Sequence, residues 1–333
     1  MKIMFVGDCD LNTGPSNVNK EFKKILSDRV SFFKFKIKIL RAIETVIKVL
    51  KSDVIIISGI SYINNLALKE AVFFKKKIIY IMHGYYAYEE KLNKFKHNEK
   101  KVKNEEYLLE KADKIITVSE KYMRFILNYF PNYKEKLTFI NNGIDWKQYE
   151  NIKIEKERDP YLIVSMGGGR PQKNNLIICE AVTLLNEKYN FPFKFVVLGR
   201  DYEDTVLIKQ NKYTNYVGQV SREKVKEWLK KSSIYIQNSS FESFGLAPIE
   251  ALCTGCNLLV SNNVGAISIL NTIKEEDIIK NYKNPDEIAK KIINIFNNPN
   301  NNRLLSGINK RETSCEYASD KLLKICLEVY NGN

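Results

Sequence analysis

The sequence predicts an α/β protein with two doubly wound domains, each a parallel sheet covered by helices on both faces. A chain of 333 residues is too long for one ordinary core. Short apolar runs alternate with segments of helical spacing along the chain. Polar or glycine-containing loops follow these runs, where open parallel sheets place their ligand sites. We therefore expect a first domain over residues 1–155, a second over residues 156–333, and a cleft between them.

The composition is typical of a globular protein without a membrane span. Hydrophobic residues make up 44% of the chain and charged residues 28%. No apolar run reaches the about 18 residues that a spanning helix needs. A strand pattern begins at Lys2, and no signal-peptide pattern is present. We expect a cytoplasmic protein, in which the cysteines stay reduced.

The net charge of +14 is concentrated in the first half of the chain. Residues 1–150 hold 28 Lys and Arg against 18 Asp and Glu, and residues 151–333 hold 25 against 21. Such a basic surface attracts nucleic acid, anionic lipid or a phosphorylated substrate, or simply keeps the protein in solution. We expect no nucleic-acid partner, because the chain has no zinc-finger motif and no aromatic-basic RNA motif.

The first domain is predicted to begin with a strand over residues 3–7, a loop, and a helix from Val18. Residues 32–51 alternate Lys with apolar residues at first and then take helical spacing. This segment fits a strand and a crossover helix leading into a buried strand over residues 53–57, and its Lys face also suits a membrane surface. Further strand and helix patterns follow over residues 60–74, 75–82, 105–128 and 137–140. The polar run over residues 150–159 predicts the linker.

The second domain is predicted to start at Tyr161 with a strand and a loop of three glycines. These glycines clear space for a phosphate, and Arg170 and Lys173 supply positive charge. The remaining elements are strands near residues 193–198, 216–220, 234–236 and 257–261, and helices near residues 176–189, 284–296 and 315–330. Cys253 and Cys256 form a C-x-x-C pair, but no second pair or nearby His completes a zinc site, so we expect buried structural thiols.

Residues 234–265 carry most of the functional signal. A short strand ends in a polar loop, and a helix follows with Pro248 in its first turn and Gly255 just past its end, where φ is positive. A loop between a strand and a helix aims free backbone N–H groups at a ligand and therefore favours a phosphate site. Glu242 and Glu250 bracket the loop. Taken singly, they also fit a solvated loop acid and a first-turn acid that complements the helix dipole.

Taken together, the two acids and the seven residues between them resemble the E-x7-E signature of retaining GT-B glycosyltransferases of family four. The resemblance covers nearly the whole chain. It implies two Rossmann-like domains facing across a cleft, with the last helix, about residues 315–330, returning to the first domain. In that family the first Glu and the following amides contact the donor sugar, and the second Glu holds the ribose hydroxyls. Carried over, these roles fall to Glu242, Phe244, Gly245, Leu246 and Glu250.

Other positions of the family are matched elsewhere in the chain. His83 follows a strand where the family has a His near the donor sugar and phosphate, although a lone His is more often a packed residue. Gly14 matches a glycine-rich turn near donor and acceptor. Lys173 and Arg170 match the basic pair at the diphosphate, at a shorter separation than is usual. The positions that would read the nucleotide base are Gly218 and Val220.

The resemblance implies a retaining hexosyltransferase that needs neither a divalent metal nor another cofactor. Asp8 and Asp10 do spell D-x-D, the metal-binding motif of a different glycosyltransferase superfamily, but here the motif ends the first strand. The donor would be a nucleoside-diphosphate sugar, with UDP favoured, carrying a hexose or an N-acetylhexosamine. The acceptor would be a glycan or a lipid-linked molecule in surface polysaccharide or glycoconjugate biosynthesis.

The basic first domain suggests peripheral attachment, by charge alone, to an anionic membrane at the inner face of the cell membrane. Two rival functions share the fold. The first is a nucleotide-sugar epimerase or hydrolase, which needs its own acid and base. The second is a non-catalytic GT-B partner subunit, against which the intact Glu242, Glu250 and Lys173 speak.

Overall fold

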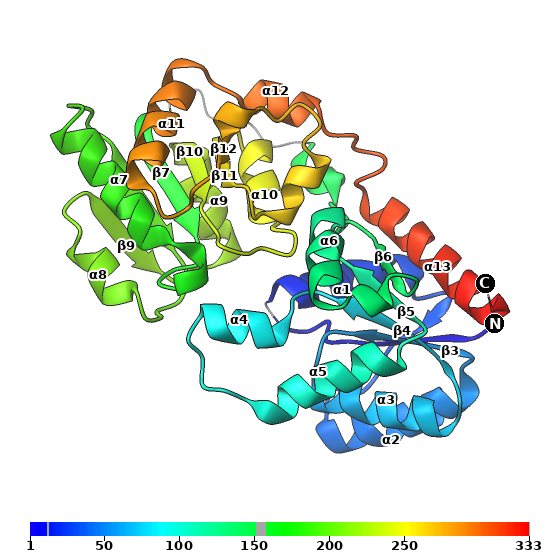
Figure 1. Cartoon of the computed structure of the whole chain (residues 1–333). Coiled ribbons are helices and arrows are strands. Elements are labelled where there is room, and N and C mark those ends of the chain that lie inside the picture. The colour runs from blue at the N-terminus through cyan, green and yellow to red at the C-terminus, as the bar shows by residue number, and fades with distance from the viewer. Residues whose placement is uncertain (12, 151–157, 333) are drawn as a thin grey trace. The chain divides into compact units, whose positions relative to one another are not determined.

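The computed structural model describes residues 1–11, 13–150 and 158–332. The chain divides into two compact units, each with a six-stranded parallel sheet and helices on both faces (Figure 1), so the predicted fold class is confirmed. Unit 1 comprises Met1–Tyr88, Lys96–Asp145 and Lys310–Asn333, and unit 2 comprises Glu89–Phe95 and Trp146–Asn309. Residues 151–157 of the predicted linker lie outside the described residues.

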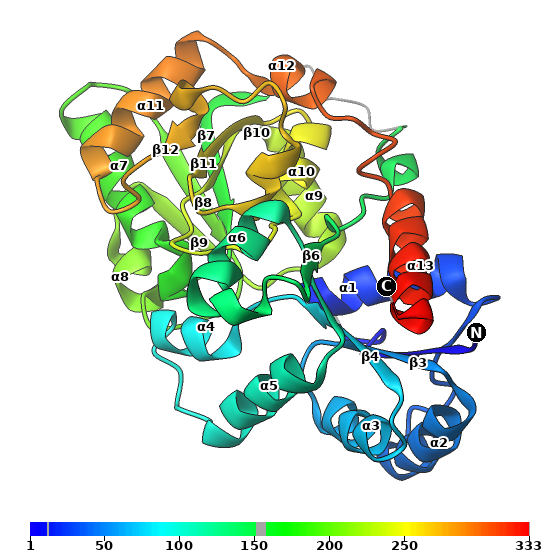
Figure 2. The same ribbon diagram turned by 45° about the vertical axis from the view of Figure 1, so that its right-hand side comes forward.

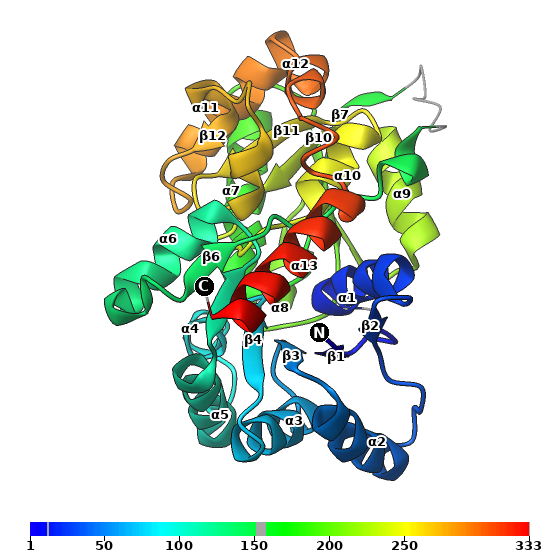
Figure 3. The ribbon, with the colours of Figure 1, turned by 90° about the vertical axis from the view of Figure 1, so that its right-hand side faces the viewer.

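Unit 1 is built on a sheet with strand order β2-β1-β3-β4-β5-β6. Its strands are β1 (Ile3–Val6), β2 (Val30–Ser31), β3 (Val54–Ser58), β4 (Lys77–Met82), β5 (Lys114–Thr117) and β6 (Leu137–Phe139). Its helices are α1 (Gly14–Leu26), α2 (Lys38–Lys51), α3 (Tyr62–Phe73), α5 (Glu99–Lys111), α6 (Glu120–Tyr129) and α13 (Cys315–Asn331). Helices α1 and α13 lie together on one face of the sheet, and α2, α3 and α5 lie on the other (Figure 3). Helix α4 (Tyr86–Leu92) spans the point at which the chain passes from unit 1 to unit 2.

Local sequence signals explain most of these elements. Strand β3 is a continuous apolar run, and Val54–Ile57 is fully buried, as expected for a central parallel strand. Ser119 caps helix α6 by accepting the N–H of Tyr122 at 3.0 Å. The segment before α13 joins unit 1 through Ile144, whose N–H donates to the carbonyl of Thr313 at 2.9 Å.

The prediction of a strand in the Lys-apolar alternation of residues 32–38 is wrong. Strand β2 ends at Ser31, and residues 32–37 form a loop before helix α2. The reason is a side chain in that helix. The carboxylate of Glu44 accepts the backbone N–H groups of Lys34 at 2.9 Å and Phe35 at 3.1 Å, so these donors bond to a carboxylate in place of a neighbouring strand.

Unit 2 is built on a sheet with strand order β12-β11-β10-β7-β8-β9. Its strands are β7 (Asp159–Met166), β8 (Lys194–Leu198), β9 (Thr214–Gly218), β10 (Ser232–Gln237), β11 (Asn257–Ser261) and β12 (Ile278–Ile279). Its helices are α7 (Asn175–Glu187), α8 (Thr205–Gln210), α9 (Arg222–Lys231), α10 (Ala247–Cys253), α11 (Pro285–Asn297) and α12 (Asn301–Ser306). Helices α7 and α11 pack together on one face, while α9 and α10 cover the other (Figure 2).

The signals that bracket helix α10 act as predicted. Pro248 occupies its first turn, and Gly255 lies just beyond its end with φ of 98°. The next strand, β11, starts at Asn257, as the sequence indicates. Cys253 and Cys256 are both buried, and burial raises the pKa of Cys256 to about 11. In the part of the chain that the structure describes, no helix is both long enough and apolar enough to span a bilayer.

Candidate functional site

Lys173 and Glu242 meet in unit 2 at the carboxyl ends of adjacent strands. Lys173 follows β7 and Glu242 follows β10, and the two strands pair in the sheet. The ammonium of Lys173 forms an ion pair with Oε2 of Glu242, and the two side chains are only 13% and 18% exposed. Gln237, the last residue of β10, donates from Nε2 to the same oxygen at 2.8 Å. Among the described residues nothing donates to Oε1 of Glu242, so this oxygen is available to a ligand hydroxyl.

The loops around this ion pair depend on two glycines with positive φ. Gly245 has φ of 87°, and a Cβ there would lie 3.0 Å from Cγ of Glu242. Gly167 has φ of 114°, and a Cβ there would lie 2.4 Å from Cγ of Lys173. A side chain at either position would strain the loop and displace one member of the pair. The carbonyl of Glu242 is held in turn by the N–H of Gly265 at 2.9 Å.

The other members of the E-x7-E stretch have different surroundings. Glu250 lies in the first turn of α10 and pairs with Nη2 of Arg222, at the start of α9, at 3.4 Å. Phe244 is only 1% exposed and packs in the core, so only its backbone can reach a ligand. Its carbonyl accepts the N–H of Ala266 at 2.6 Å. Leu246 is partly buried directly before α10, which has only seven residues and hence a short dipole.

Arg170 and the predicted base-reading loop lie farther along the same sheet edge. The guanidinium of Arg170 stacks on Tyr202, 5.1 Å from the ring centroid, and donates to the Tyr202 hydroxyl at 3.3 Å. Its Nε is buried and has no hydrogen-bond partner among the described residues. Gly218 ends β9 with φ of 84°, and the partly buried Val220 follows it. Strand β9 is separated from β7 by β8, so this loop is two strands away from the loop that holds Lys173.

Glu89 is a functional candidate that sequence reasoning missed. It is partly buried and belongs to unit 2, where burial raises the pKa of its carboxyl to about 7. The negative charge of Glu242 adds to this increase, while the positive charges of Arg170 and Lys173 oppose it. A carboxyl that is half protonated near neutral pH, close to a catalytic candidate, is a typical feature of an active site. The one signal in the sequence is an acidic pair, Glu89 and Glu90, after an aromatic run.

Replacing Glu89 by Gln should change how stability depends on pH. Because the pKa of Glu89 is raised in the folded state, the folded protein holds its proton between about pH 4.5 and pH 7, and wild-type stability falls as pH rises through that window. The Gln variant lacks this loss. As pH rises from about 5 to about 8, the wild type should lose about 2–3 kcal/mol of its free energy of unfolding through Glu89, whereas the variant should not. The difference between variant and wild type should therefore grow by that amount in favour of the variant. Denaturant unfolding at several pH values measures the difference, and a constant difference would contradict the raised pKa.

In unit 1, His83 ends a chain of hydrogen bonds that joins three neighbouring strands. Asn19 donates from Nδ2 to the carbonyl of Asp8 at 2.9 Å and accepts the hydroxyl of Ser58 at 2.6 Å. The Ser58 oxygen lies 2.8 Å from Nε2 of His83. Since the Ser58 proton is used on Asn19, His83 must donate from Nε2, which leaves Nδ1 as an acceptor. Burial lowers the pKa of His83 to about 4, so the ring is neutral at physiological pH and suits a sugar hydroxyl better than a phosphate charge.

Gly14 and Asp8 take different roles in the segment that joins β1 to α1. Gly14 is the first residue of helix α1, and Thr13 caps this helix through the N–H of Ser16. Oδ1 of Asp8 accepts the N–H groups of Asp10 at 2.9 Å and Leu11 at 3.0 Å, which is an Asx-type turn. In the described ranges, no group of three or more His, Cys, Asp or Glu side chains is placed to hold a metal ion.

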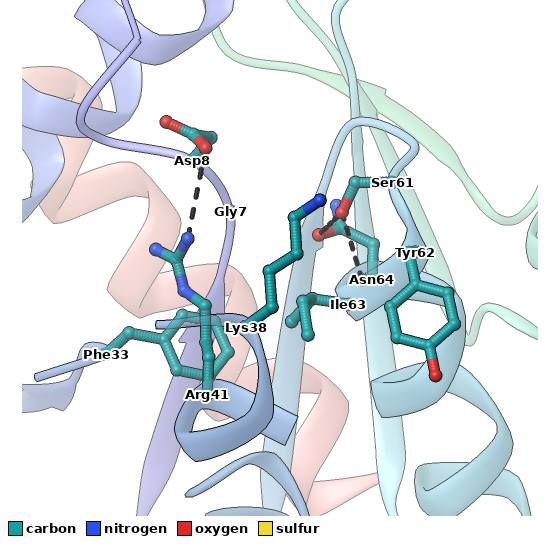
Figure 4. A pocket seen from close by; sticks show the side chains of 9 residues that line it. All are labelled: Gly7, Asp8, Phe33, Lys38, Arg41, Ser61, Tyr62, Ile63 and Asn64. Carbon is teal, nitrogen blue, oxygen red and sulfur yellow. Dashed lines mark hydrogen bonds and ion pairs between the residues drawn. The ribbon is translucent and has the colours of Figure 1, made fainter. Parts of the chain in front are cut away.

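A pocket of about 290 Å³ opens at the carboxyl ends of β1 and β3 (Figure 4). It is lined by Gly7, Asp8, Phe33, Lys38, Arg41, Ser61, Tyr62, Ile63 and Asn64. Arg41 reaches Asp8 at 4.0 Å on one side of the pocket, and Ser61 bonds to Asn64 at 2.8 Å on the other. Lys38 lies between them, and Tyr62 is 74% exposed. The pocket therefore combines positive charge, hydroxyl and amide groups, and an aromatic ring, which suits a polar or anionic ligand.

Two family models match consecutive parts of the chain. The model described as Glycosyltransferase Family 4 matches residues 14–148, and the model described as Glycosyl transferases group 1 matches residues 147–312. An uncharacterized glycosyltransferase of Methanocaldococcus jannaschii is 25% identical over 227 residues, which cover 67% of this chain and 61% of that protein. The matched region thus spans about three fifths of the length of this curated relative.

Solved structures of the same fold align with nearly the whole chain. The crystal structure of Anabaena HepE in complex with UDP and glucose has a TM-score of 0.72 at 12% identity and covers 98% of this chain and 100% of its own. Sucrose-phosphate synthase from Thermosynechococcus elongatus has a TM-score of 0.70 at 15% identity, with both chains fully covered. Together the two family models match residues 14–312, and the fold is that of GT-B enzymes. The chain therefore belongs to the GT-B glycosyltransferases of family four.

Proposed function

We propose that this protein transfers a hexose or an N-acetylhexosamine from a UDP-sugar to a glycan or lipid-linked acceptor, with retention of configuration and without a divalent metal. The observation that carries the proposal is the cluster of Lys173, Glu242 and Gln237 at the carboxyl ends of β7 and β10. A lysine and a carboxylate held together at a ligand-binding sheet edge suit a substrate that combines a diphosphate with sugar hydroxyls. A lipid-linked acceptor would place this cytoplasmic enzyme at the inner face of the cell membrane, in surface polysaccharide or glycoconjugate biosynthesis.

In the proposed reaction the acceptor oxygen attacks C1 of the sugar on the face from which the diphosphate leaves. The C1 bond to the diphosphate oxygen breaks, the new glycosidic bond forms, and the acceptor proton passes to the departing diphosphate. Negative charge builds up on the diphosphate in the transition state, and Lys173 stabilises it, with Arg170 as a second cation. Glu242 positions Lys173 and offers Oε1 to a sugar hydroxyl. Glu250 would hold the ribose hydroxyls.

The preference for UDP rests on a likeness of fold. The HepE structure is described as a complex with UDP and glucose, and we extend that donor class to this chain as part of the proposal. Turnover with a panel of nucleotide sugars, followed by NMR of the product anomer, tests both the donor and retention. An inverted product would contradict the proposed mechanism.

A sugar-nucleotide hydrolase remains the second candidate. The observation that favours it is Glu89, which could act as a protonated acid beside Glu242. Release of free sugar in the absence of any acceptor, at the rate seen with acceptor, would favour hydrolysis over transfer.

Activity should survive removal of divalent metals. The proposal gives the charge-stabilising role to Lys173 and Arg170, so EDTA should change kcat by less than about twofold. Turnover is measured after dialysis against EDTA, with and without added manganese. Loss of turnover that manganese restores would return Asp8 and Asp10 to consideration as metal ligands.

Replacing Glu250 by Ala should weaken binding of free UDP. A carboxylate that accepts two ribose hydroxyls makes charge-assisted hydrogen bonds, and their loss should raise Kd by about 10–100-fold. Isothermal titration calorimetry with UDP measures the change. Glu227→Ala is a matched control, because Glu227 also pairs with a basic residue, Lys224 at 2.6 Å, but lies exposed on α9. Unchanged affinity in Glu250→Ala would leave this acid with only its Arg222 ion pair and its place at the helix dipole.

A further inference from the structure

Helix α2 turns its apolar side outward. Six large apolar side chains of this helix and the loop before it are about half exposed or more: Phe35 49%, Ile37 64%, Ile39 73%, Ile43 54%, Ile47 46% and Leu50 47%. On the helix these residues follow one another at intervals of three or four, so they form a single stripe, which we call the α2 stripe. A surface helix of a globular protein ordinarily turns such a stripe toward the core. No described element of unit 1 covers the α2 stripe.

The inward side of α2 holds Thr45, Val49 and a buried acid, Glu44, whose bonds fix the rotation of the helix. Glu44 is 6% exposed, and its carboxylate pairs with Lys48 at 2.7 Å. It also accepts the N–H of Lys34 at 2.9 Å. Although burial opposes ionisation, these bonds hold the pKa of Glu44 below its ordinary value. Turning the α2 stripe inward would carry this carboxylate out to solvent and break its bonds to the backbone N–H groups of Lys34 and Phe35. The outward direction of the stripe is therefore built into the unit.

The surroundings of the α2 stripe are basic. Residues 32–52 contain six Lys and Arg and one acidic residue, and the acidic residue is the buried Glu44. Lys34, Lys36, Lys38 and Lys51 are exposed next to the stripe. Helix α2 lies at the edge of its layer, beside α3 (Figure 3), so the stripe and its lysines form an outer surface of the unit.

We propose that helix α2 docks unit 1 on an anionic membrane, with the α2 stripe inserted among the lipids and the flanking lysines at the headgroups. An apolar stripe edged by Lys is the pattern of helices that lie in the plane of a membrane interface. A second copy of this chain is a poorer partner, because a symmetric dimer would bring the same lysines face to face. The proposed docking differs from attachment by charge alone, because the apolar side chains of the α2 stripe make the larger contact with the membrane.

Docking through α2 would bring the pocket of Figure 4 close to the membrane, and the use of this pocket by an acceptor rests on the proposed function. Lys38, the first residue of α2, lines this pocket together with Arg41. A helix lying in the interface would therefore hold the pocket at headgroup level, within reach of a lipid-linked acceptor that carries an anionic group.

Sedimentation of the full chain with vesicles tests the docking. Wild type should bind vesicles containing phosphatidylglycerol and should bind vesicles of pure phosphatidylcholine weakly. The double variant Ile43→Glu and Ile47→Glu should lose at least about tenfold in binding to the anionic vesicles. Both side chains are exposed, so the variant should fold, and circular dichroism checks this. The matched control is Val206→Glu with Leu207→Glu, which makes the same change at exposed apolar residues of helix α8 in unit 2 and should bind like wild type.

A second measurement reports insertion directly. In an Ile43→Trp variant, brominated lipid should quench the fluorescence of the new Trp more strongly than that of the native tryptophans, and high salt should weaken binding without abolishing it. Three results would overturn the proposal. They are equal binding by the stripe and control variants, binding that high salt removes completely, and no binding by wild type. The proposal would also be overturned if analytical ultracentrifugation without vesicles showed a wild-type dimer that the double Glu variant does not form. The Glu242→Gln variant should still bind vesicles, so failed docking and failed transfer can be told apart.

Discussion

Replacing Glu242 by Gln should lower kcat by about 10²–10³-fold while the protein stays folded. The carboxylate joins Lys173 and Gln237 at one oxygen, and in the proposed reaction its other oxygen accepts a hydroxyl of the donor sugar. An amide keeps the size and can still accept from Lys173, so the loop should hold its shape. The charge that positions the lysine is lost, and removal of one such electrostatic group from an active site costs a factor of this size. Turnover with the preferred nucleotide sugar measures the loss, and thermal unfolding checks the fold.

Two further measurements distinguish a catalytic role of Glu242 from a purely structural one. Glu276→Gln is the matched control, because Glu276 pairs with Lys274 at 3.7 Å on the exposed surface of the same unit, and its loss should leave kcat unchanged. The negative charge of Glu242 also helps to raise the pKa of Glu89, so that pKa should fall in Glu242→Gln. A variant that keeps half or more of wild-type turnover would remove Glu242 from the catalytic machinery.

Replacing Lys173 by Met should lower kcat/KM by a similar factor of about 10²–10³. Met keeps much of the apolar stem against Gly167 but removes the cation that would stabilise the leaving diphosphate. Because the lysine and Glu242 act as a pair, the double variant Lys173→Met with Glu242→Gln should lose much less than the product of the two single losses. Steady-state kinetics of the four proteins complete the cycle.

Lys280→Met provides the reference for a lysine outside the site. Lys280 pairs with Glu275 at 3.0 Å, and both side chains are mostly exposed, so the substitution should leave kinetics and stability close to wild type. Single losses that simply multiply in the double variant would mean that Lys173 and Glu242 act independently, which would contradict the paired role.

The sequence predicted most of the fold because the signals that set each element are local. Pro248 and Gly255 bracket α10, as the residue types indicate. The prediction failed where a distant side chain overrides a local pattern. The Lys-apolar alternation before α2 is typical of a strand, yet Glu44, about ten residues away, binds the backbone donors.

The candidate site was predicted in part for a related reason. The spacing of Glu242 and Glu250 located both acids, but it could not identify their partners Gln237 and Arg222, which the order of strands and helices brings to them. Glu89 was missed because nothing in its neighbourhood along the chain suggests a raised pKa. Its environment arises only when residues 89–95 join unit 2.

The grouping of residues 89–95 with unit 2 also limits how this chain could be recombined with its relatives. The chain passes between the units after Tyr88, Phe95, Asp145 and Asn309, not at one junction. A chimera with a single fusion point near residue 155 would take the first part of unit 1 from one parent and its last helix, α13, from the other. It would also pair the Glu89 segment of one parent with the Lys173 and Glu242 loops of the other. If unit 2 binds the donor as proposed, exchange of donor specificity should move residues 89–95 together with residues 146–309 and leave residues 310–333 with the rest of unit 1.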